Sequence, residues 1–241
     1  MLKNSELDAA IIATPTNTHH QVAIDCLNNG LNILIEKPIA TNLKEAQNID
    51  STAKRANKIA MVGMNARFRP DSMLLKSLIN GGNLGEIFYI RCGWNRKQSS
   101  NENWFLKKKE SGGGVILDLG IVILDLGIWL LDYPPLKSIS VQNFMHQSES
   151  VEDSAVGFLR FKNNTVINFE VSWSFHSEKD NFVLTAFGTE GTAHLNPLRA
   201  YKRVAGSHFD YTPATTGNIK NLYNKSYENE LKHFIASVRG E

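Results

Sequence analysis

Short apolar runs alternate with helical patterns through the first 66 residues of the chain. The runs at residues 8–15 and 32–35 show no polar alternation, which is typical of strands buried on both faces. A third apolar run covers residues 59–63. Between these runs, residues 19–29 and 42–56 carry apolar side chains at helical spacing. This strand–helix–strand rhythm predicts a parallel sheet with right-handed crossovers.

The pattern changes in the rest of the chain, where a helix over residues 70–80 is followed by strands joined mainly by turns. The predicted strands cover residues 87–94, 138–143, 154–161, 166–173 and 182–187, and residues 188–192 form a hairpin turn into one more strand. Consecutive strands without helices between them predict a mostly antiparallel sheet. Residues 196–225 are polar and predict a long loop, and residues 227–238 predict a closing helix.

The longest apolar run, residues 115–131, follows three consecutive glycines and predicts a buried helix. Helix geometry places Asp118, Val122, Asp125 and Trp129 on one face. A membrane span is disfavoured, because each Asp near its centre costs about 2.5–3.5 kcal/mol. Two interpretations remain open. The Asp side chains cap neighbouring backbone groups in a core helix, or Asp118 faces a cleft whose floor is the glycine turn.

Polar residues follow each strand of the predicted parallel sheet. Thr14-Pro15, Glu36-Lys37-Pro38 and Asn65 all stand where a strand ends. In such sheets ligands bind outside the carboxyl ends of the strands. The sequence therefore predicts that one edge of this sheet collects the polar groups of a binding site.

Composition excludes several classes of function. The chain has 241 residues, of which 42% are hydrophobic and 21% charged, as in ordinary soluble domains. Its net charge of +2 implies neither a nucleic-acid partner nor a membrane surface. Cys26 and Cys92 are too few for a disulfide framework, which suits a reducing cytoplasm, and no signal peptide is visible. No cluster of His, Cys and carboxylates has metal-ligand spacing, so we expect no metal site.

Six short motifs occur in a fixed order along the chain. They are Ala13-Thr14-Pro15 with His19, Gly30, Glu36-Lys37-Pro38, Gly112-Gly113-Gly114-Val115-x-x-Asp118-x-Gly120, Glu152-Asp153 and Gly188-Thr189-Glu190-Gly191-Thr192. Together they resemble the Gfo/Idh/MocA family of NAD(P)-dependent oxidoreductases, which act on sugars, inositols and related polyols. Each motif alone is weak, but their order and spacing together are specific.

The resemblance implies hydride transfer between NAD or NADP and a small sugar-like or polyol substrate. The matched catalytic residues are Lys37, beside the nicotinamide and the reacting carbon, and Asp118 in the same cluster. An ammonium near the reacting oxygen would stabilise its developing negative charge. The expected cofactor-binding residues are Thr14, Pro15, His19, Glu36, Lys37, Pro38 and Asn65. The alternatives are that Lys37 is a surface lysine and that Glu36 is only its ion-pair partner.

The resemblance also implies the organisation of the chain. Residues 1–66 are expected to form a partial Rossmann-like dinucleotide-binding domain with an α/β fold. Residues 67–241 are expected to form an α+β domain for substrate binding and oligomerisation, with the Gly-Gly-Gly helix at the interface. We expect a cytoplasmic homo-oligomer assembled through the antiparallel sheet.

Two departures from the family pattern bear on activity. The sequence shows no Gly-x-Gly-x-x-Gly unit and stops at a helix, so it is expected to be truncated at both ends and to expose an apolar sheet edge. Position 122, where the family usually has an acid/base His, is Val122. His176 or Tyr89 could take that role. The alternative function is a catalytically degenerate homologue that acts as a binding or oligomerisation module.

Overall fold

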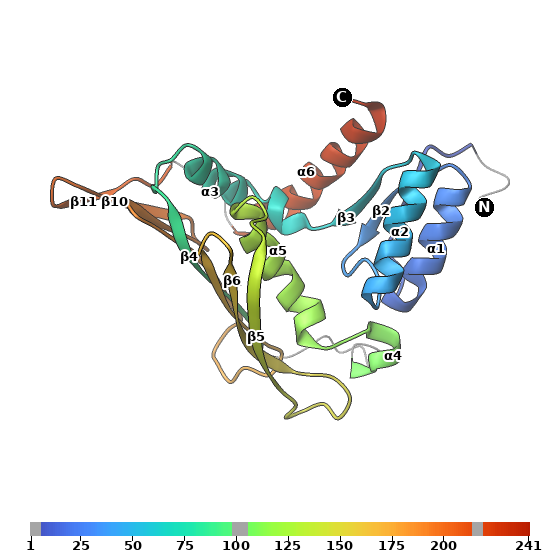
Figure 1. The fold of residues 1–241 in the computed structure, drawn as a ribbon, viewed down its shortest axis with the longest axis horizontal. Coiled ribbons are helices and arrows are strands. Elements are labelled where there is room, and N and C mark those ends of the chain that lie inside the picture. The colour runs from blue at the N-terminus through green and yellow to red at the C-terminus, as the bar shows by residue number, and fades with distance from the viewer. Residues whose placement is uncertain (1–5, 98–105, 214–218) are drawn as a thin grey trace.

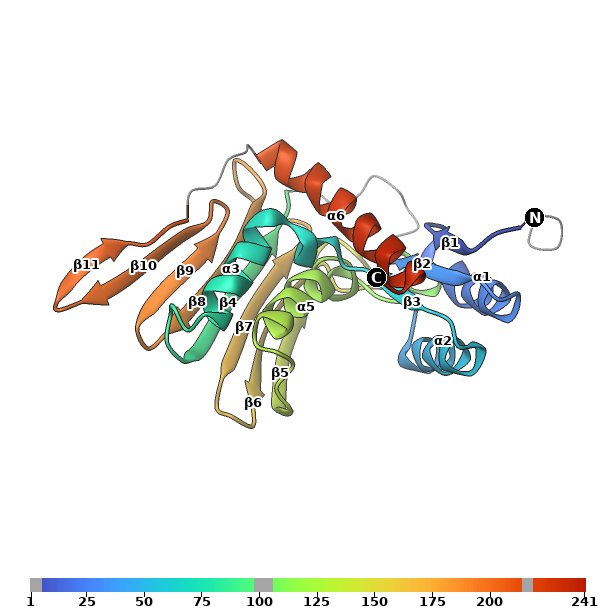
Figure 2. The ribbon, with the colours of Figure 1, turned by 90° about the horizontal axis from the view of Figure 1, so that it is seen from above.

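A computed structural model of the protein describes residues 6–97, 106–213 and 219–241. The described residues form two β-sheets with helices beside and between them (Figure 1). The smaller sheet lies at one end of the molecule and the larger sheet at the other. Seen from above, the final helix runs from the larger sheet to the smaller one (Figure 2).

The smaller sheet has three parallel strands, as predicted from the apolar runs. In spatial order they are β1 (Ala9–Ile12), β2 (Asn32–Glu36) and β3 (Ala60–Gly63). Two helices, α1 (Thr16–Asn28) and α2 (Leu43–Ala56), pack on this sheet and bury its apolar side chains. This first core contains Ile12, Ala23, Leu27, Ile33, Ile35 and Ile49.

Register in the smaller sheet aligns the carboxyl ends of its strands. Ile12 lies opposite Ile35, and Glu36 lies opposite Gly63. The residues that follow these strands therefore gather at one edge, as the sequence predicts. β1 lies at one edge of this sheet, and its Ile11 is 60% exposed.

The larger sheet has eight strands in the order β11-β10-β9-β8-β4-β7-β6-β5. Their bounds are β4 (Ile87–Asn95), β5 (Leu136–Phe144), β6 (Ser154–Phe161), β7 (Val166–Ser172), β8 (Asn181–Gly188), β9 (Gly191–Leu195), β10 (Arg199–Val204) and β11 (Ser207–Asp210). β4 and β7 pair in parallel, and the other neighbours pair antiparallel. The prediction of a mostly antiparallel sheet is confirmed.

The Gly-Gly-Gly helix packs on one face of the larger sheet, as predicted for a buried helix. Its first turn, η3 (Ile116–Gly120), is π-helical and continues as α5 (Ile121–Leu130). Together with α3 (Pro70–Asn80) it encloses the second core. Among the described residues, 108–130 form the one helical segment apolar and long enough to cross a membrane. Half of that segment is buried inside the protein, which is typical of a core helix.

The predicted loop over residues 196–225 is wrong. This stretch contains the β10–β11 hairpin, and α6 (Ile219–Arg239) begins eight residues before the predicted closing helix at Tyr227. The two strands have no apolar alternation because both of their faces are largely exposed, so pairing with β9 forms them rather than a core. The early turns of α6 are polar, and contacts with distant residues hold them.

α6 links the two halves of the molecule. Asn229 Nδ2 donates to the carbonyl oxygen of Phe68 at 3.0 Å, in the short helix η1 (Asn65–Phe68). Further along α6, Phe234 is 3% exposed and lines a cavity with Ala9 of β1. The helix assigned by sequence to the second domain therefore lines a cavity together with β1 of the first sheet. The domain boundary between residues 66 and 67 stays a prediction.

Candidate active site

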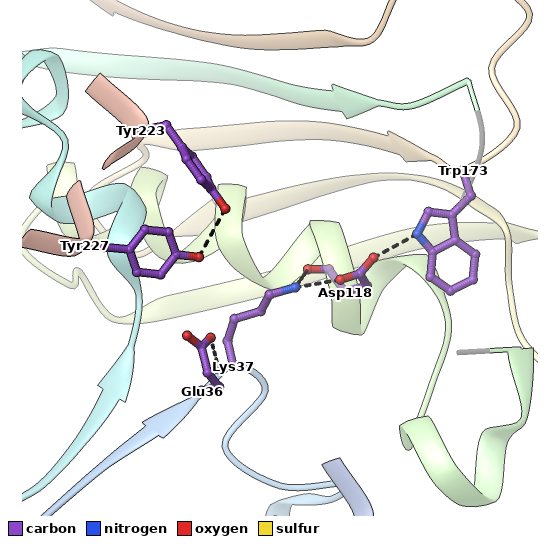
Figure 3. Close-up of polar contacts among 6 residues, drawn as sticks. All are labelled: Glu36, Lys37, Asp118, Trp173, Tyr223 and Tyr227. Carbon is purple, nitrogen blue, oxygen red and sulfur yellow. Dashed lines mark hydrogen bonds and ion pairs between the residues drawn. The ribbon is translucent and has the colours of Figure 1, made fainter. Parts of the chain in front are cut away.

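Lys37 and Asp118 meet at the carboxyl end of β2, although 81 residues separate them in sequence (Figure 3). The Lys37 Nζ lies 2.6 Å from Oδ1 of Asp118 and 3.0 Å from its main-chain oxygen. Their side chains are 26% and 15% exposed. The expectation that these two residues share one environment is confirmed, whereas their catalytic roles stay predictions.

The π-helical turn sets the position of Asp118. A π turn widens the helix, and such turns occur frequently at functional sites. Within it, Asp118 presents a main-chain and a side-chain oxygen to the same ammonium group. The helical wheel drawn from sequence assumes a uniform α-helix and places Val122 beside Asp118. In the structure Val122 is only 6% exposed and belongs to the second core.

Trp173 holds the second carboxylate oxygen of Asp118. Its indole Nε1–H donates to Oδ2 at 3.0 Å, and the residue is 3% exposed (Figure 3). Trp173 directly follows β7, so the larger sheet reaches the Lys37–Asp118 pair through this side chain. Sequence reasoning missed Trp173 because no local pattern relates it to Asp118.

The glycine turn positions the start of the helix. Gly112 has a φ of +84° and packs on Thr41, where an added Cβ would lie 2.8 Å from backbone atoms. The Glu152 carboxylate accepts hydrogen bonds from the N–H groups of Gly114 and Ile116, both at 3.1 Å. A carboxylate that accepts from these otherwise free N–H groups caps the helix. Its negative charge is stabilised by the positive end of the helix dipole. The Glu152 motif therefore supports the turn rather than the pocket.

A cavity of about 210 Å³ lies between the glycine turn and the carboxyl ends of β1 and β2. Its lining residues are Ala13, Thr14, Thr16, His19, Glu36, Lys37, Pro38, Ser111, Gly113, Gly114, Leu117 and Asp118. Among the expected cofactor-binding residues, Thr14, His19, Glu36, Lys37 and Pro38 are brought together here. Sequence reasoning had not assigned Thr16, Ser111 or Leu117 to the site.

The structure does not place Pro15 and Asn65 in this cavity. Pro15 is exposed just before α1, and its carbonyl oxygen accepts from the Thr18 N–H at 2.9 Å. Asn65 begins η1, and its Nδ2 donates to Oγ of Ser226 at 3.2 Å. The sequence argument placed both at strand ends, and the family resemblance also implied Pro15, but neither lines this cavity.

His19 ties the walls of the cavity together. It is 1% exposed, and its two ring nitrogens lie 2.7 Å from the Thr14 carbonyl oxygen and 2.9 Å from that of Pro38. These contacts join α1 to the turns after β1 and β2. The imidazole therefore shapes the cavity by holding its walls, while both nitrogens are already engaged.

Glu36 is not the ion-pair partner of Lys37, which corrects that alternative. Its Oε2 accepts from the main-chain N–H of Lys37 at 3.3 Å, while the Lys37 ammonium pairs with Asp118. Glu36 instead acts on α6, where burial and then the charge of Glu36 raise the pKa of Glu230 to about 7. Burial and contact with Tyr223 also raise the pKa of Tyr227, whose hydroxyl lies 3.3 Å from that of Tyr223 (Figure 3).

The two residues considered as replacements for the family histidine lie elsewhere. Tyr89 stacks on Phe187 of β8, with ring centroids 5.0 Å apart. His176 lines a separate cavity with Glu170 of β7 and with Phe175, in the segment between β7 and β8. Neither Tyr89 nor His176 lines the Lys37 cavity.

The donors and apolar walls of the cavity fit part of a dinucleotide cofactor. The Thr14 hydroxyl lies 2.7 Å from that of Thr18, and as a hydroxyl it can both donate and accept. Pro38 and Leu117 provide apolar walls, and the Lys37 ammonium provides the charge. A small pocket with apolar walls and few polar groups is typical of cofactor sites. No group of three His, Cys, Asp or Glu that could hold a metal occurs in the described ranges.

Comparisons with known proteins match most of the chain. Residues 1–64 match a family of oxidoreductases with an NAD-binding Rossmann fold, and residues 73–194 match the GFO/IDH/MocA C-terminal domain. The scyllo-inositol 2-dehydrogenase (NAD(+)) of Bacillus subtilis (strain 168) is 29% identical over 99% of this chain and 70% of its own length. The D-glucoside 3-dehydrogenase of Escherichia coli (strain K12) is 26% identical over 83% of this chain and 62% of its own length.

Solved structures share this fold. Levoglucosan dehydrogenase in complex with NADH and levoglucosan has a TM-score of 0.87 and 22% identity, over 99% of this chain and 73% of that one. The chain spans 58 to 70% of the length of three curated relatives, which are the scyllo-inositol and D-glucoside dehydrogenases and the putative UDP-kanosamine synthase oxidoreductase subunit of Amycolatopsis mediterranei (strain S699).

The glycine turn yields a first prediction. Ala at position 114 would place its Cβ 2.0 Å from the Glu152 carbonyl oxygen, so Gly114→Ala should lower the free energy of unfolding by about 1–3 kcal/mol. Gly113→Ala is the matched control, because its Cβ meets only the flexible Leu117 side chain at 3.3 Å. Urea unfolding measures both. Equal stability of the two variants would contradict the close approach of Glu152.

Glu230 yields a second prediction. The folded state holds its proton up to about pH 7, whereas the unfolded chain releases it near 4.5. Since the folded state binds more protons between these values, the free energy of unfolding should fall by up to about 1.4 kcal/mol per pH unit as the pH rises through this window. Glu230→Gln should flatten this slope in urea unfolding at pH 5, 6 and 7.

The exposed Glu228 provides the matched control for that titration. Two lysines lower the pKa of Glu228 to about 2, so Glu228→Gln should leave the slope between pH 5 and 7 unchanged. A slope in Glu230→Gln as steep as that of the wild type would show that another group titrates.

Proposed function

Because the chain belongs to the Gfo/Idh/MocA family of oxidoreductases with an NAD-binding Rossmann fold, we propose that it transfers hydride between NAD or NADP and a sugar, inositol or related polyol. The names of the relatives, a scyllo-inositol dehydrogenase and a D-glucoside dehydrogenase, support this class of substrate. The observation that carries the proposal is the contact of Lys37 with Asp118 beside a cavity at the carboxyl ends of the parallel strands.

Lys37 is the proposed catalytic centre. Its ammonium stabilises the negative charge that develops on the substrate oxygen as the C–H bond breaks. Asp118 holds the ammonium in place and keeps its charge paired before substrate arrives. Bound nicotinamide supplies the hydride acceptor or donor. Because Val122 cannot carry a proton, the Asp118 carboxylate is the proposed proton acceptor: the Lys37 ammonium passes one N–H proton to Asp118 as it takes the proton of the substrate hydroxyl.

The proposed cofactor site is built from the turns after β1 and β2. Thr14 donates a hydroxyl proton, Pro38 and Glu36 form a wall, and His19 keeps these turns together. Pro15, implied by the family resemblance, and Asn65, from its place at a strand end, remain proposed cofactor contacts outside the cavity that the described residues form.

Lys37→Ala tests the catalytic assignment. The assay follows NADH fluorescence with scyllo-inositol, a D-glucoside and levoglucosan as substrates. The variant should lower kcat by about 10²–10⁴-fold, the usual loss for a group that handles charge and protons, while NADH still binds. Lys76→Ala is the control, since Lys76 is also a partly buried lysine paired with a carboxylate, that of Asp132.

Two results would contradict the proposal. A folded wild-type protein that binds neither NADH nor NADPH would remove the cofactor. Unchanged turnover in Lys37→Ala would remove the assigned residue.

A catalytically degenerate homologue is the second candidate, favoured by one observation. Val122 occupies the position of the family histidine and is packed in the second core, and its side chain has no group that could carry a proton. In that case the protein would bind the nicotinamide cofactor without turning over any substrate, and it would serve as a binding or oligomerisation module.

We propose that the open face of the larger sheet assembles copies of this chain. β6 alternates buried and exposed residues, and the side chains turned away from the helices include Val156 and Phe158, 44% and 38% exposed. Phe144 and Tyr201 lie on the same face, 37% and 42% exposed. An apolar sheet face open to water is typical of a subunit interface. A twofold contact between two such faces would cover these side chains.

Phe158→Lys tests this assembly. A charge placed in a covered apolar interface should shift the protein to a smaller species in size-exclusion chromatography with light scattering. Leu43→Lys on α2 is the control, because Leu43 is 72% exposed on the other half of the molecule. A wild-type protein that is already monomeric at micromolar concentration would contradict the assembly.

We also place the protein in the cytoplasm. Cys26 and Cys92 are both free and buried. Free thiols without a disulfide partner suit a reducing compartment.

A further inference from the structure

The indole of Trp173 points at the reacting end of the site from the larger sheet. We propose that Trp173 is a positioning residue, which fixes the orientation of the Asp118 carboxylate and through it the place of the Lys37 ammonium. The catalytic consequence rests on the proposed function, whereas the positioning itself can be measured without it.

The two oxygens of Asp118 have separate partners. Oδ1 binds Lys37 at 2.6 Å and Oδ2 binds Trp173 at 3.0 Å, from opposite ends of the carboxylate (Figure 3). Rotation of a carboxylate about its last bond meets only a broad, roughly two-fold preference, so one partner alone leaves it free to turn. Two partners on different oxygens fix the plane of the group.

Indole is suited to this task. Its N–H can only donate, so it binds an ionised carboxylate and never competes for the Lys37 protons. It does not titrate in the accessible range, so the contact persists at any pH at which Asp118 is ionised. A lysine or arginine in the same place would bind Asp118 more strongly but would add a second cation beside Lys37.

The larger sheet holds Trp173 rigidly. Its main-chain N–H donates to the carbonyl oxygen of Asp153 at 2.9 Å, and the side chain is packed in the second core. The carboxylate of Asp153 in turn accepts from the N–H groups of His146 and Gln147, both at 2.6 Å. The donor that orients Asp118 is therefore fixed by strands and not by a side chain in solvent.

This arrangement leaves one donor of Lys37 for chemistry. An ammonium has three N–H groups, and Asp118 takes two of them through Oδ1 and its main-chain oxygen. Among the described residues, none accepts a hydrogen bond from the third N–H of Lys37, and the two bonds to Asp118 fix its direction beside the cavity. Loss of the Trp173 contact would loosen that direction without removing either charged group.

Trp173→Phe tests the inference, because it removes the N–H and keeps an aromatic ring. Brief acetylation with an N-hydroxysuccinimide ester, followed by peptide mass spectrometry, measures how accessible each lysine is. Lys37 should react roughly tenfold faster in the variant, the change expected when a hydrogen bond to a charged group is lost. Lys76, also paired with a carboxylate, is the internal control and should not change.

Trp94→Phe is the matched variant. Trp94 packs edge-on against Phe182 in the same sheet, with ring centroids 5.5 Å apart, and serves to measure the general cost of replacing a tryptophan. Faster labelling of Lys37 in Trp173→Phe alone supports the inference. Labelling of Lys37 at the wild-type rate in folded Trp173→Phe would overturn it.

A second measurement covers the case in which Trp173→Phe fails to fold. In protein labelled with 15N-tryptophan, the Trp173 indole proton should exchange with solvent roughly tenfold faster in Asp118→Ala than in the wild type. Equal exchange rates would show that the indole does not bind the carboxylate in solution.

Turnover separates this inference from the proposed function. If both hold, Trp173→Phe lowers kcat roughly tenfold, by the same lost hydrogen bond, with little change in KM or in NADH binding. If the wild type binds no NADH but labelling and exchange respond as described, the proposed function fails and the positioning role stands.

Discussion

The contact between Lys37 and Asp118 is the constraint on which the candidate site depends. It joins the carboxyl end of β2 to the first turn of the central helix, and Trp173 extends it to the larger sheet. Both charged side chains are partly exposed, so screening by water and the cost of desolvation leave little net stabilisation of the fold. The contact matters for position: it places one ammonium group at a defined point between two sheets.

The central helix shows how an apolar segment tolerates two carboxylates. Asp118 binds Lys37, and Asp125 forms a two-pronged ion pair with Arg67 of η1, with Nε 2.7 Å from Oδ2. A buried carboxylate is costly only when it is unpaired. Both belong to the same tetrapeptide, Asp-Leu-Gly-Ile, which occurs in a π turn at 118 and in regular α-helix at 125. Identical local sequence therefore adopts two geometries, and the partners across the molecule distinguish them.

The two charged residues at the end of β2, Glu36 and Lys37, act on different parts of the molecule. Lys37 turns toward the central helix, while Glu36 lines the cavity. Burial, and then the charge of Glu36, raise the pKa of Glu230 on α6. α6 therefore brings a buried carboxyl group that titrates near neutrality to the back of the site.

The sequence by itself determined the parts of this protein that depend on local pattern. Apolar runs and helical spacing gave the parallel sheet, the mostly antiparallel sheet and the buried helix, since burial of a strand or helix is written in its own residues. The motif order pointed to Lys37, Asp118, Thr14 and His19. The sequence did not predict the β10–β11 hairpin or the early turns of α6. These elements have no apolar pattern, because strand pairing and contacts with distant residues form them.

Only the tertiary structure decided which distant residues contact one another. Trp173 lies 55 residues from Asp118, and the alternative that Glu36 is the ion-pair partner of Lys37 is wrong, because the ammonium pairs with Asp118. Pro15 and Asn65 follow strands but do not line the cavity. Hydrophobic periodicity records which side of an element is buried and carries no information about the direction of a side chain after the element ends. Those directions are set by contacts between segments that the chain brings together only when it folds.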